Sequence, residues 1–122
     1  MIIVDSSGWI EYLSGGPRAE KYEKYLSRLA EVITPAVVFY EVYKKIKMVK
    51  GEEKALLVAA QILKTNIVPL DSEIAIYAAE VSLRCSIPMA DAIIYATALS
   101  KKCPVVTSDP HFQNLEGAIF LK

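Results

Sequence analysis

Residues 1–7, Met-Ile-Ile-Val-Asp-Ser-Ser, place a short β-branched run directly before an acid and two hydroxyl residues. Four more short runs of strand-forming residues lie at 32–33, 67–68, 105–107 and 118–121, and most are separated by helix-length stretches. Strands that alternate with helices are typical of a parallel sheet with helices on both faces. The sequence therefore predicts an α/β fold with a central, mostly parallel sheet of about five short strands.

Helices are expected in the intervening stretches, which carry recognisable start and stop signals. Ser6 or Ser7 is expected to cap a first helix that ends at Gly15. Thr34 and Pro35 are expected to cap and open a helix that runs to about Val49 and buries that residue. The other expected helices cover 19–30, 52–64, the stretch after Asp71 or Ser72, and the stretch that begins at Pro88.

The length of the chain favours a single domain over residues 1–122, because 122 residues support one core and are too few to divide into two. Hydrophobic residues make up 53% of the chain, yet no apolar run approaches the roughly 18 residues needed to cross a bilayer. The amino terminus also lacks a signal-peptide pattern. We therefore expect a cytoplasmic protein with no membrane partner, whose two cysteines, Cys85 and Cys103, are buried and reduced.

The charges of the chain balance, with 14 Lys and Arg residues against 14 Asp and Glu residues. No global basic field is therefore available to recruit nucleic acid, and any RNA must be bound by a local patch.

Four acids stand where an α/β sheet places its ligand site: Asp5, Glu41, Asp91 and Asp109. Asp5 and Asp109 each follow a strand, and the carboxyl ends of parallel strands form the edge at which such sheets bind ligands. Each acid alone also has a structural explanation, as a helix cap, a turn residue or, for Glu41, an ion-pair partner of Lys45. Asp91, however, is surrounded by apolar neighbours, which favours an acid that needs a partner.

A cluster of carboxylates without basic partners repels itself unless it shares a proton or binds a divalent cation. Oxygen ligands with no Cys or His favour Mg²⁺ or Mn²⁺ over Zn²⁺. One or two such ions can polarise a phosphodiester and lower the pKa of water. The predicted chemistry is phosphodiester hydrolysis.

Four segments together resemble PIN-domain nucleases: the opening Ile-Ile-Val-Asp-Ser-Ser at 2–7, the helix of Glu41, the stretch Pro-Met-Ala-Asp-Ala-Ile-Ile-Tyr-Ala at 88–96, and Val-Val-Thr-Ser-Asp-Pro-His-Phe at 105–112. The resemblance spans the whole chain, and a compact chain of this kind is most similar to the VapC-type toxins of toxin–antitoxin pairs. It implies a magnesium-dependent endoribonuclease that is usually dimeric and is held inactive by a small antitoxin.

The resemblance also implies roles for single residues. Asp5, Glu41, Asp91 and Asp109 match the metal-binding acids of the family, and Ser7 and Thr107 match hydroxyl residues that orient those acids or a bound water. The chain departs from the pattern at His111, where many relatives have another aspartate. A fifth carboxylate ligand is therefore in doubt, and His111, the only histidine, is either a phosphate or proton-transfer contact or simply an exposed loop residue.

Contacts with RNA are less clearly marked in the sequence. Lysines at 44, 45, 47 and 50 share the helix of Glu41, where they either hold phosphates or form a solvated helix face. The aromatic residues Trp9, Tyr12, Tyr40 and Tyr43 either stack bases, line a protein interface or belong to the core.

Other functions compete with the toxin hypothesis. A dehalogenase-like phosphatase would need a second Asp where Ser7 stands, and a receiver domain would need an acidic pair near the first strand and a lysine after a late strand. Within the PIN family, an RNA-maturation nuclease and a non-catalytic binding scaffold remain as alternatives. Added domains or basic tails would mark the first, and loss of an acid would mark the second.

Overall fold

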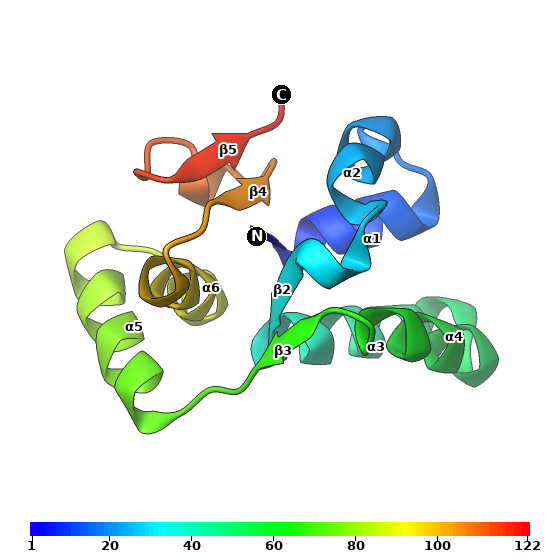
Figure 1. Ribbon diagram of the computed structural model, residues 1–122, viewed down its shortest axis with the longest axis horizontal. Helices are drawn as coiled ribbons and strands as arrows, with labels where there is room; N and C mark the ends of the chain where they lie inside the picture. Colours follow the sequence, from blue (N-terminus) through cyan, green and yellow to red (C-terminus); the bar gives the residue numbers. More distant parts are fainter.

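The sheet at the centre of the protein contains five strands, all parallel, in the order β3-β2-β1-β4-β5. The computed structural model describes residues 1–122 and is shown in Figure 1. The strands are β1 (Ile2–Val4), β2 (Val32–Pro35), β3 (Asn66–Val68), β4 (Val105–Thr107) and β5 (Ala118–Phe120). The predicted α/β class and the five-stranded parallel sheet are thereby confirmed.

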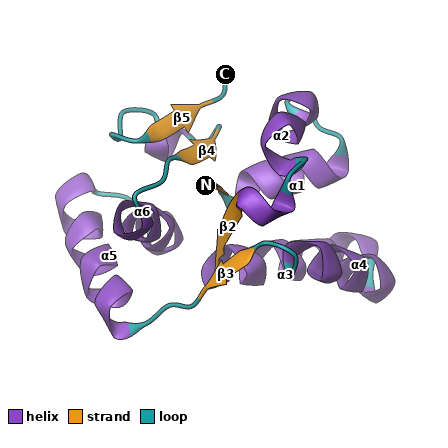
Figure 2. Ribbon diagram, in the orientation of Figure 1, coloured by secondary structure: helices purple, strands orange, loops and turns teal.

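Six α-helices and two 3₁₀ turns connect the strands (Figure 2). In Figure 1, α5 and α6 lie to one side of the sheet, and α1 and α2 lie to the other. The helices are α1 (Ser6–Ser14), α2 (Ala19–Leu26), α3 (Ala36–Lys50), α4 (Glu52–Ile62), α5 (Ser72–Cys85) and α6 (Met89–Lys101), and the 3₁₀ turns are η1 (Leu29–Glu31) and η2 (Pro110–Phe112).

The strand order reverses beside β1. After β1 the chain builds β2 and β3 on one side of it, and then returns to build β4 and β5 on the other side. Ile3 of β1 therefore pairs with Ile33 of β2 and also with Val105 of β4. Ligands of open α/β sheets bind outside the carboxyl ends of the strands at such a switch point. The residues that follow β1 and β4 lie at this position.

The core lies between the sheet and its helices. The largest side chains with no solvent exposure are Trp9 of α1, Tyr22 of α2 and Phe112 of η2, which fix elements near the site to the sheet. The strand residues Val105 and Val106 are also fully buried. Burial on both faces explains why these strands are continuous β-branched runs and show no polar alternation.

Several helix limits differ from those expected. The second helix ends at Leu26, and η1 follows, so the predicted helix over 19–30 was too long. Thr34 and Pro35 lie in β2, and the fully buried hydroxyl of Thr34 bonds to Thr65 at 2.6 Å. It therefore does not cap α3. Asp5, and not Ser6 or Ser7, caps α1.

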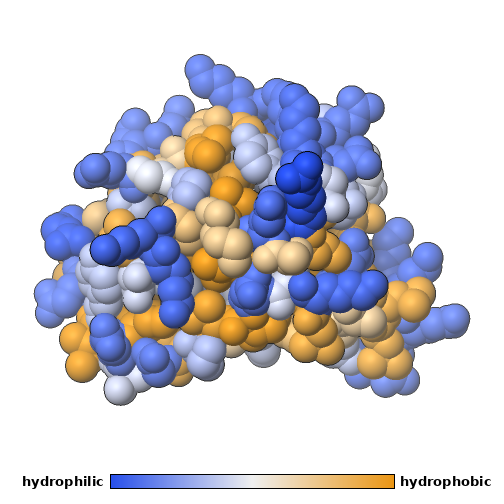
Figure 3. Space-filling view, viewed as in Figure 1, coloured by the Kyte–Doolittle hydropathy of each residue, from blue (hydrophilic) through white to orange (hydrophobic).

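Apolar side chains also remain on the surface. Val49, expected in the core, is 59% exposed. It lies on the same side of α3 as the buried Val42 and Ile46, but in the last turn of the helix, which ends at Lys50. Apolar patches are visible in Figure 3. Both cysteines are free, as expected, but each is only partly buried. None of the helices combines the length and the apolar character needed to cross a bilayer.

Candidate active site

Asp5 is held at the carboxyl end of β1 by three hydrogen bonds. Its Oδ1 accepts from the backbone N–H of Gly8 at 2.9 Å, which caps α1, and its Oδ2 accepts from the Ser7 hydroxyl at 2.9 Å. Oδ2 also accepts from the Thr107 hydroxyl at 2.6 Å. With only 2% of its surface exposed, this carboxylate has a fixed orientation.

Gly8 permits the close approach of α1 to this carboxylate. A Cβ atom at residue 8 would stand 2.6 Å from Cε1 of Tyr22, 2.8 Å from Cγ1 of Val4 and 2.9 Å from Oδ1 of Asp5. These distances are shorter than van der Waals contact, so no other residue fits without movement of the core.

Glu41 reaches the same region from the middle of α3. Its Oε1 accepts a hydrogen bond from the hydroxyl of Ser6, the first residue of α1. The two residues are 35 positions apart, so this bond links α1 to α3 beside Asp5, the residue that precedes Ser6.

Asp91 and Asp109 meet through His111. Nδ1 of His111 lies 2.9 Å from Oδ2 of Asp91 and 3.0 Å from Oδ1 of Asp109. Asp91 is in the first turn of α6, and Asp109 caps η2 by accepting from the backbone N–H of His111 at 2.9 Å. The backbone N–H of Asp109 donates to Thr107 Oγ1 at 2.9 Å, so Thr107 connects Asp109 to Asp5.

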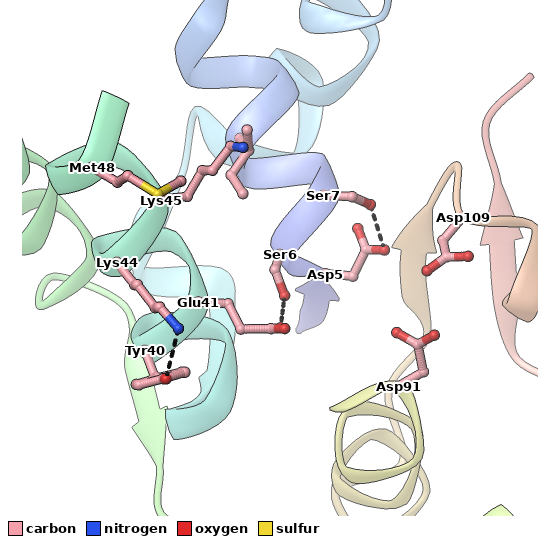
Figure 4. A pocket seen from close by; sticks show the side chains of 11 residues that line it. Asp5, Ser6, Ser7, Tyr40, Glu41, Lys44, Lys45, Met48, Asp91 and Asp109 are labelled. Carbon is pink, nitrogen blue, oxygen red and sulfur yellow. Dashed lines mark hydrogen bonds between the residues drawn. The ribbon is translucent and has the colours of Figure 1, made fainter. Parts of the chain in front are cut away.

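All four acids line one cleft of about 460 Å³. Figure 4 shows the carboxylates of Asp5, Asp91 and Asp109 turned toward one another, with Glu41 beside Ser6. Tyr40, Lys44, Lys45 and Met48 of α3 complete one wall of the cleft together with Ile10 of α1. None of the four acids forms an ion pair with Lys or Arg.

Burial, with a further effect of neighbouring like charges, raises the pKa of two of the acids. Burial raises the pKa of Asp5, against the lowering effect of its hydrogen bonds to Thr107, Gly8 and Ser7. Burial and the neighbouring charge of Asp109 raise the pKa of Asp91 to about 6, although His111 opposes this rise. Asp5 and Glu41 add smaller upward effects. Such a site favours a positive charge among the carboxylates.

The structure thus brings together all six residues singled out in the sequence: the four acids, Ser7 and Thr107. Only two of the four lysines, Lys44 and Lys45, line the cleft. Nζ of Lys47 lies 3.5 Å from Oε1 of Glu52. Lys50 lines a separate pocket beside α4.

Of the four aromatic residues singled out in the sequence, only one lines the cleft. Trp9 is fully buried in the core, whereas Tyr40 is 61% exposed and lines the cleft. Tyr12 and Tyr43 are partly buried against the core. The side chain of Lys44 lies over the Tyr40 ring, with Nζ 5.5 Å from its centre. A cation and an exposed ring therefore stand together at the mouth of the cleft.

Sequence reasoning missed two residues of the site. Ser6 was considered only as a helix cap, and its bond to Glu41 depends on how α1 packs against α3. Gly8 gave no signal, because a glycine in a helix normally indicates only a weak helix position. His111 was noted, but its contacts with Asp91 and Asp109 depend on the packing of η2 against α6.

Solved structures that share this fold include toxins and their complexes. A toxin–antitoxin complex from Klebsiella pneumoniae superposes with a TM-score of 0.82 at 19% identity, covering 98% of this chain and 96% of that chain. The sarcin-ricin loop cleaving toxin VapC20 of Mycobacterium tuberculosis superposes with a TM-score of 0.82 at 20% identity, covering 100% and 99%. FitAcB of Neisseria gonorrhoeae gives a TM-score of 0.79 at 24% identity, covering 99% and 97%.

At these identities the likeness shows a shared fold. No curated protein matches the sequence significantly. The profile of the PIN domain, in contrast, matches residues 2–118. Because this match covers nearly the whole chain, the protein belongs to the PIN domain family.

Proposed function

We propose that the protein is a metal-dependent endoribonuclease that hydrolyses RNA through Asp5, Glu41, Asp91 and Asp109. The observation that carries the proposal is the convergence of four carboxylates on one cleft without a lysine or arginine paired to any of them. The proposal is supported by the raised pKa values of Asp5 and Asp91, which result first from burial and then from neighbouring carboxylates, because a bound cation would offset both effects.

The donor set of the cleft fits a divalent cation. Carboxylate oxygens from Asp5, Asp91 and Asp109 suit hard ions such as Mg²⁺ or Mn²⁺, and Glu41 adds a further oxygen donor in the same cleft. When bound, such an ion polarises the phosphodiester and lowers the pKa of water.

The other residues of the cleft position these acids and the RNA. Thr107, Ser7 and the backbone of Gly8 hold the Asp5 carboxylate, and Ser6 holds Glu41. Lys44 and Lys45 supply positive charge on the α3 wall, where phosphates of an RNA strand would pass. The exposed ring of Tyr40 is available for stacking on an unpaired base, which favours single-stranded or loop RNA.

We further propose that the protein is the toxin of a toxin–antitoxin pair, and that it is a cytoplasmic homodimer inhibited by a small antitoxin. The support comes from family membership, from the toxin–antitoxin complex and the toxin VapC20 among the structural neighbours, and from apolar residues exposed on α3 and α4. A short adjacent reading frame encoding a DNA-binding domain with an amphipathic tail would support this assignment. Its absence would favour RNA maturation.

The test of the nuclease is cleavage of a defined RNA hairpin by the purified protein, with the product ends mapped by mass spectrometry. We expect cleavage that requires Mg²⁺ or Mn²⁺ and leaves a 5′ phosphate and a 3′ hydroxyl, because the chain offers no pair of histidines to assist attack by the 2′ hydroxyl. Cleavage in excess chelator, or products with a 2′,3′-cyclic phosphate, would contradict the mechanism.

Amide variants identify the acids involved. Asp5→Asn, Glu41→Gln, Asp91→Asn and Asp109→Asn are each expected to lose most activity and to remain folded, because removal of a charge relieves repulsion in the metal-free protein. Glu80→Gln on α5 is the matched control, since Glu80 is exposed and lies outside the cleft. Equal activity of Glu41→Gln and Glu80→Gln would exclude Glu41 from the site.

A further inference from the structure

The histidine beside the cleft contacts two of the four acids. Nδ1 of His111 lies 2.9 Å from Asp91 Oδ2 and 3.0 Å from Asp109 Oδ1, and one donor atom from each of the three residues lies within 4.8 Å of the others. Two ligands at adjacent corners of an octahedron with bonds of about 2.1 Å are separated by about 3 Å. The distances from Nδ1 of His111 to the two carboxylate oxygens therefore match the separation of neighbouring ligands around one metal ion.

This placement is fixed by the backbone around His111. Asp109 accepts from the His111 backbone N–H at 2.9 Å, so the same carboxylate that faces the imidazole also orders the turn that carries it. The next residue, Phe112, has no solvent exposure and packs edge-on against Tyr95 of α6, with ring centres 6.4 Å apart. The imidazole is held toward Asp91 even though its side chain is 52% exposed.

We propose that His111 binds the metal ion of this cleft through Nδ1, together with Asp91 and Asp109, and thereby favours Mn²⁺ over Mg²⁺. The inference rests on the proposed function, because it adds a nitrogen ligand to the carboxylate site. Mg²⁺ takes oxygen ligands and retains its waters. An imidazole nitrogen suits transition metals. One nitrogen among carboxylates changes the preferred ion without changing the fold.

The single histidine makes a spectroscopic test specific. In tag-free protein loaded with Mn²⁺, pulsed electron paramagnetic resonance detects the coupling of an imidazole ¹⁴N to the ion, and only His111 can supply that signal. We expect the coupling in the wild type and its loss in His111→Asp. The aspartate keeps an oxygen donor at this position but supplies no imidazole nitrogen.

Calorimetric titrations with Mn²⁺ and Mg²⁺ measure the preference. The ratio of Mn²⁺ affinity to Mg²⁺ affinity is expected to fall on the order of tenfold in His111→Asp, while Glu80→Gln leaves it unchanged. Mn²⁺ binding that is lost in Asp91→Asn but shows no ¹⁴N coupling in the wild type would overturn the role of His111 and leave the carboxylate site standing. No binding of either ion to the wild type would overturn both proposals.

Discussion

The hydroxyl of Thr107 donates a 2.6 Å hydrogen bond to Asp5 across 102 positions of the sequence. The same oxygen accepts from the backbone N–H of Asp109 at 2.9 Å. One fully buried hydroxyl on β4 therefore sets the orientation of the acid after β1 and the course of the chain toward the acid after β4. Thr107 is therefore a positioning residue for both Asp5 and Asp109.

Replacement of Thr107 by valine tests this relationship. The variant keeps the shape of the side chain but removes one of the two hydroxyl donors to Oδ2 of Asp5 and leaves the backbone N–H of Asp109 without its partner. The expected cost is about 1–3 kcal/mol of unfolding free energy. Because the lost bond lowers the pKa of Asp5, that pKa should rise and Mn²⁺ affinity should fall at acidic pH. Thr107→Ser, which retains the hydroxyl, should resemble the wild type. Urea unfolding and metal titration give both readouts, and equal metal affinity in Thr107→Val would contradict the positioning role.

Gly8→Ala should damage the site through packing. The new Cβ would press on Tyr22 and Val4, both fully buried, and on Oδ1 of Asp5. A loss of about 1–3 kcal/mol is expected, with weaker metal binding than the stability loss alone explains. Gly16→Ala is the control for the site, because its Cβ would also stand 2.6 Å from a side-chain carbon, Cγ of Glu11, but outside the cleft. Metal binding weakened equally in the two variants would contradict an effect of Gly8 through the Asp5 carboxylate.

The pKa of Asp91 predicts how stability depends on pH in the metal-free protein. Burial first, and then the charges of Asp109, Asp5 and Glu41, raise this pKa from 3.8 to about 6, while His111 opposes the rise. Between these values the folded state binds more protons than the unfolded chain, so the unfolding free energy contributed by Asp91 falls as pH rises. Above about pH 6 Asp91 is charged in both the folded and the unfolded state, and the full loss of unfolding free energy is present.

Asp91→Asn removes that loss of unfolding free energy. In the presence of chelator, the variant is expected to be more stable than the wild type at pH 8, by on the order of 1 kcal/mol. The two proteins should be nearly equal below about pH 4, where Asp91 is protonated in both states. Urea titrations at pH 4, 6 and 8 measure the difference, with Glu80→Gln as the control. A variant less stable than the wild type at pH 8 would contradict the prediction, because it would mean that the charged Asp91 stabilises the folded state.

The apolar surface predicts self-association. Met48 and Val49 of α3 and Leu56 and Leu57 of α4 are each more than half exposed, more than a small monomer commonly shows on one pair of helices. Light scattering at micromolar concentration is expected to give twice the chain mass of 13.5 kDa. Leu57→Lys should shift the mass toward the monomer if this surface forms the interface. A wild-type monomer at all concentrations would contradict the predicted dimer.

Much of the architecture follows from local sequence. The run Ile2–Val4 and the run Val105–Thr107 are short, β-branched and buried on both faces, and each precedes an acid, so adjacency in a parallel sheet places Asp5 and Asp109 together. The first turn of α6 was also apparent, because Asp91 interrupts an apolar helix after Pro88. These signals need no knowledge of side-chain packing.

The remaining features depend on contacts between distant segments. Thr34 and Pro35 carry a helix-start pattern, yet β2 extends through both, because Thr34 pairs with Ile67 in the sheet and its hydroxyl bonds to Thr65. Ser6 meets Glu41 only because α1 packs on α3. His111 reaches Asp91 only because Phe112 anchors η2 beside Tyr95. Such tertiary contacts override or add to local preference.

The strand order has a consequence for biosynthesis. Because β4 completes the middle of the sheet late in translation, a nascent or prematurely terminated chain that stops before residue 105 has Asp5 and Glu41 but lacks Thr107, Asp109 and the neighbouring strand of β1. Truncated products therefore lack the complete carboxylate cluster. The four acids can come together only when nearly the whole polypeptide has been made.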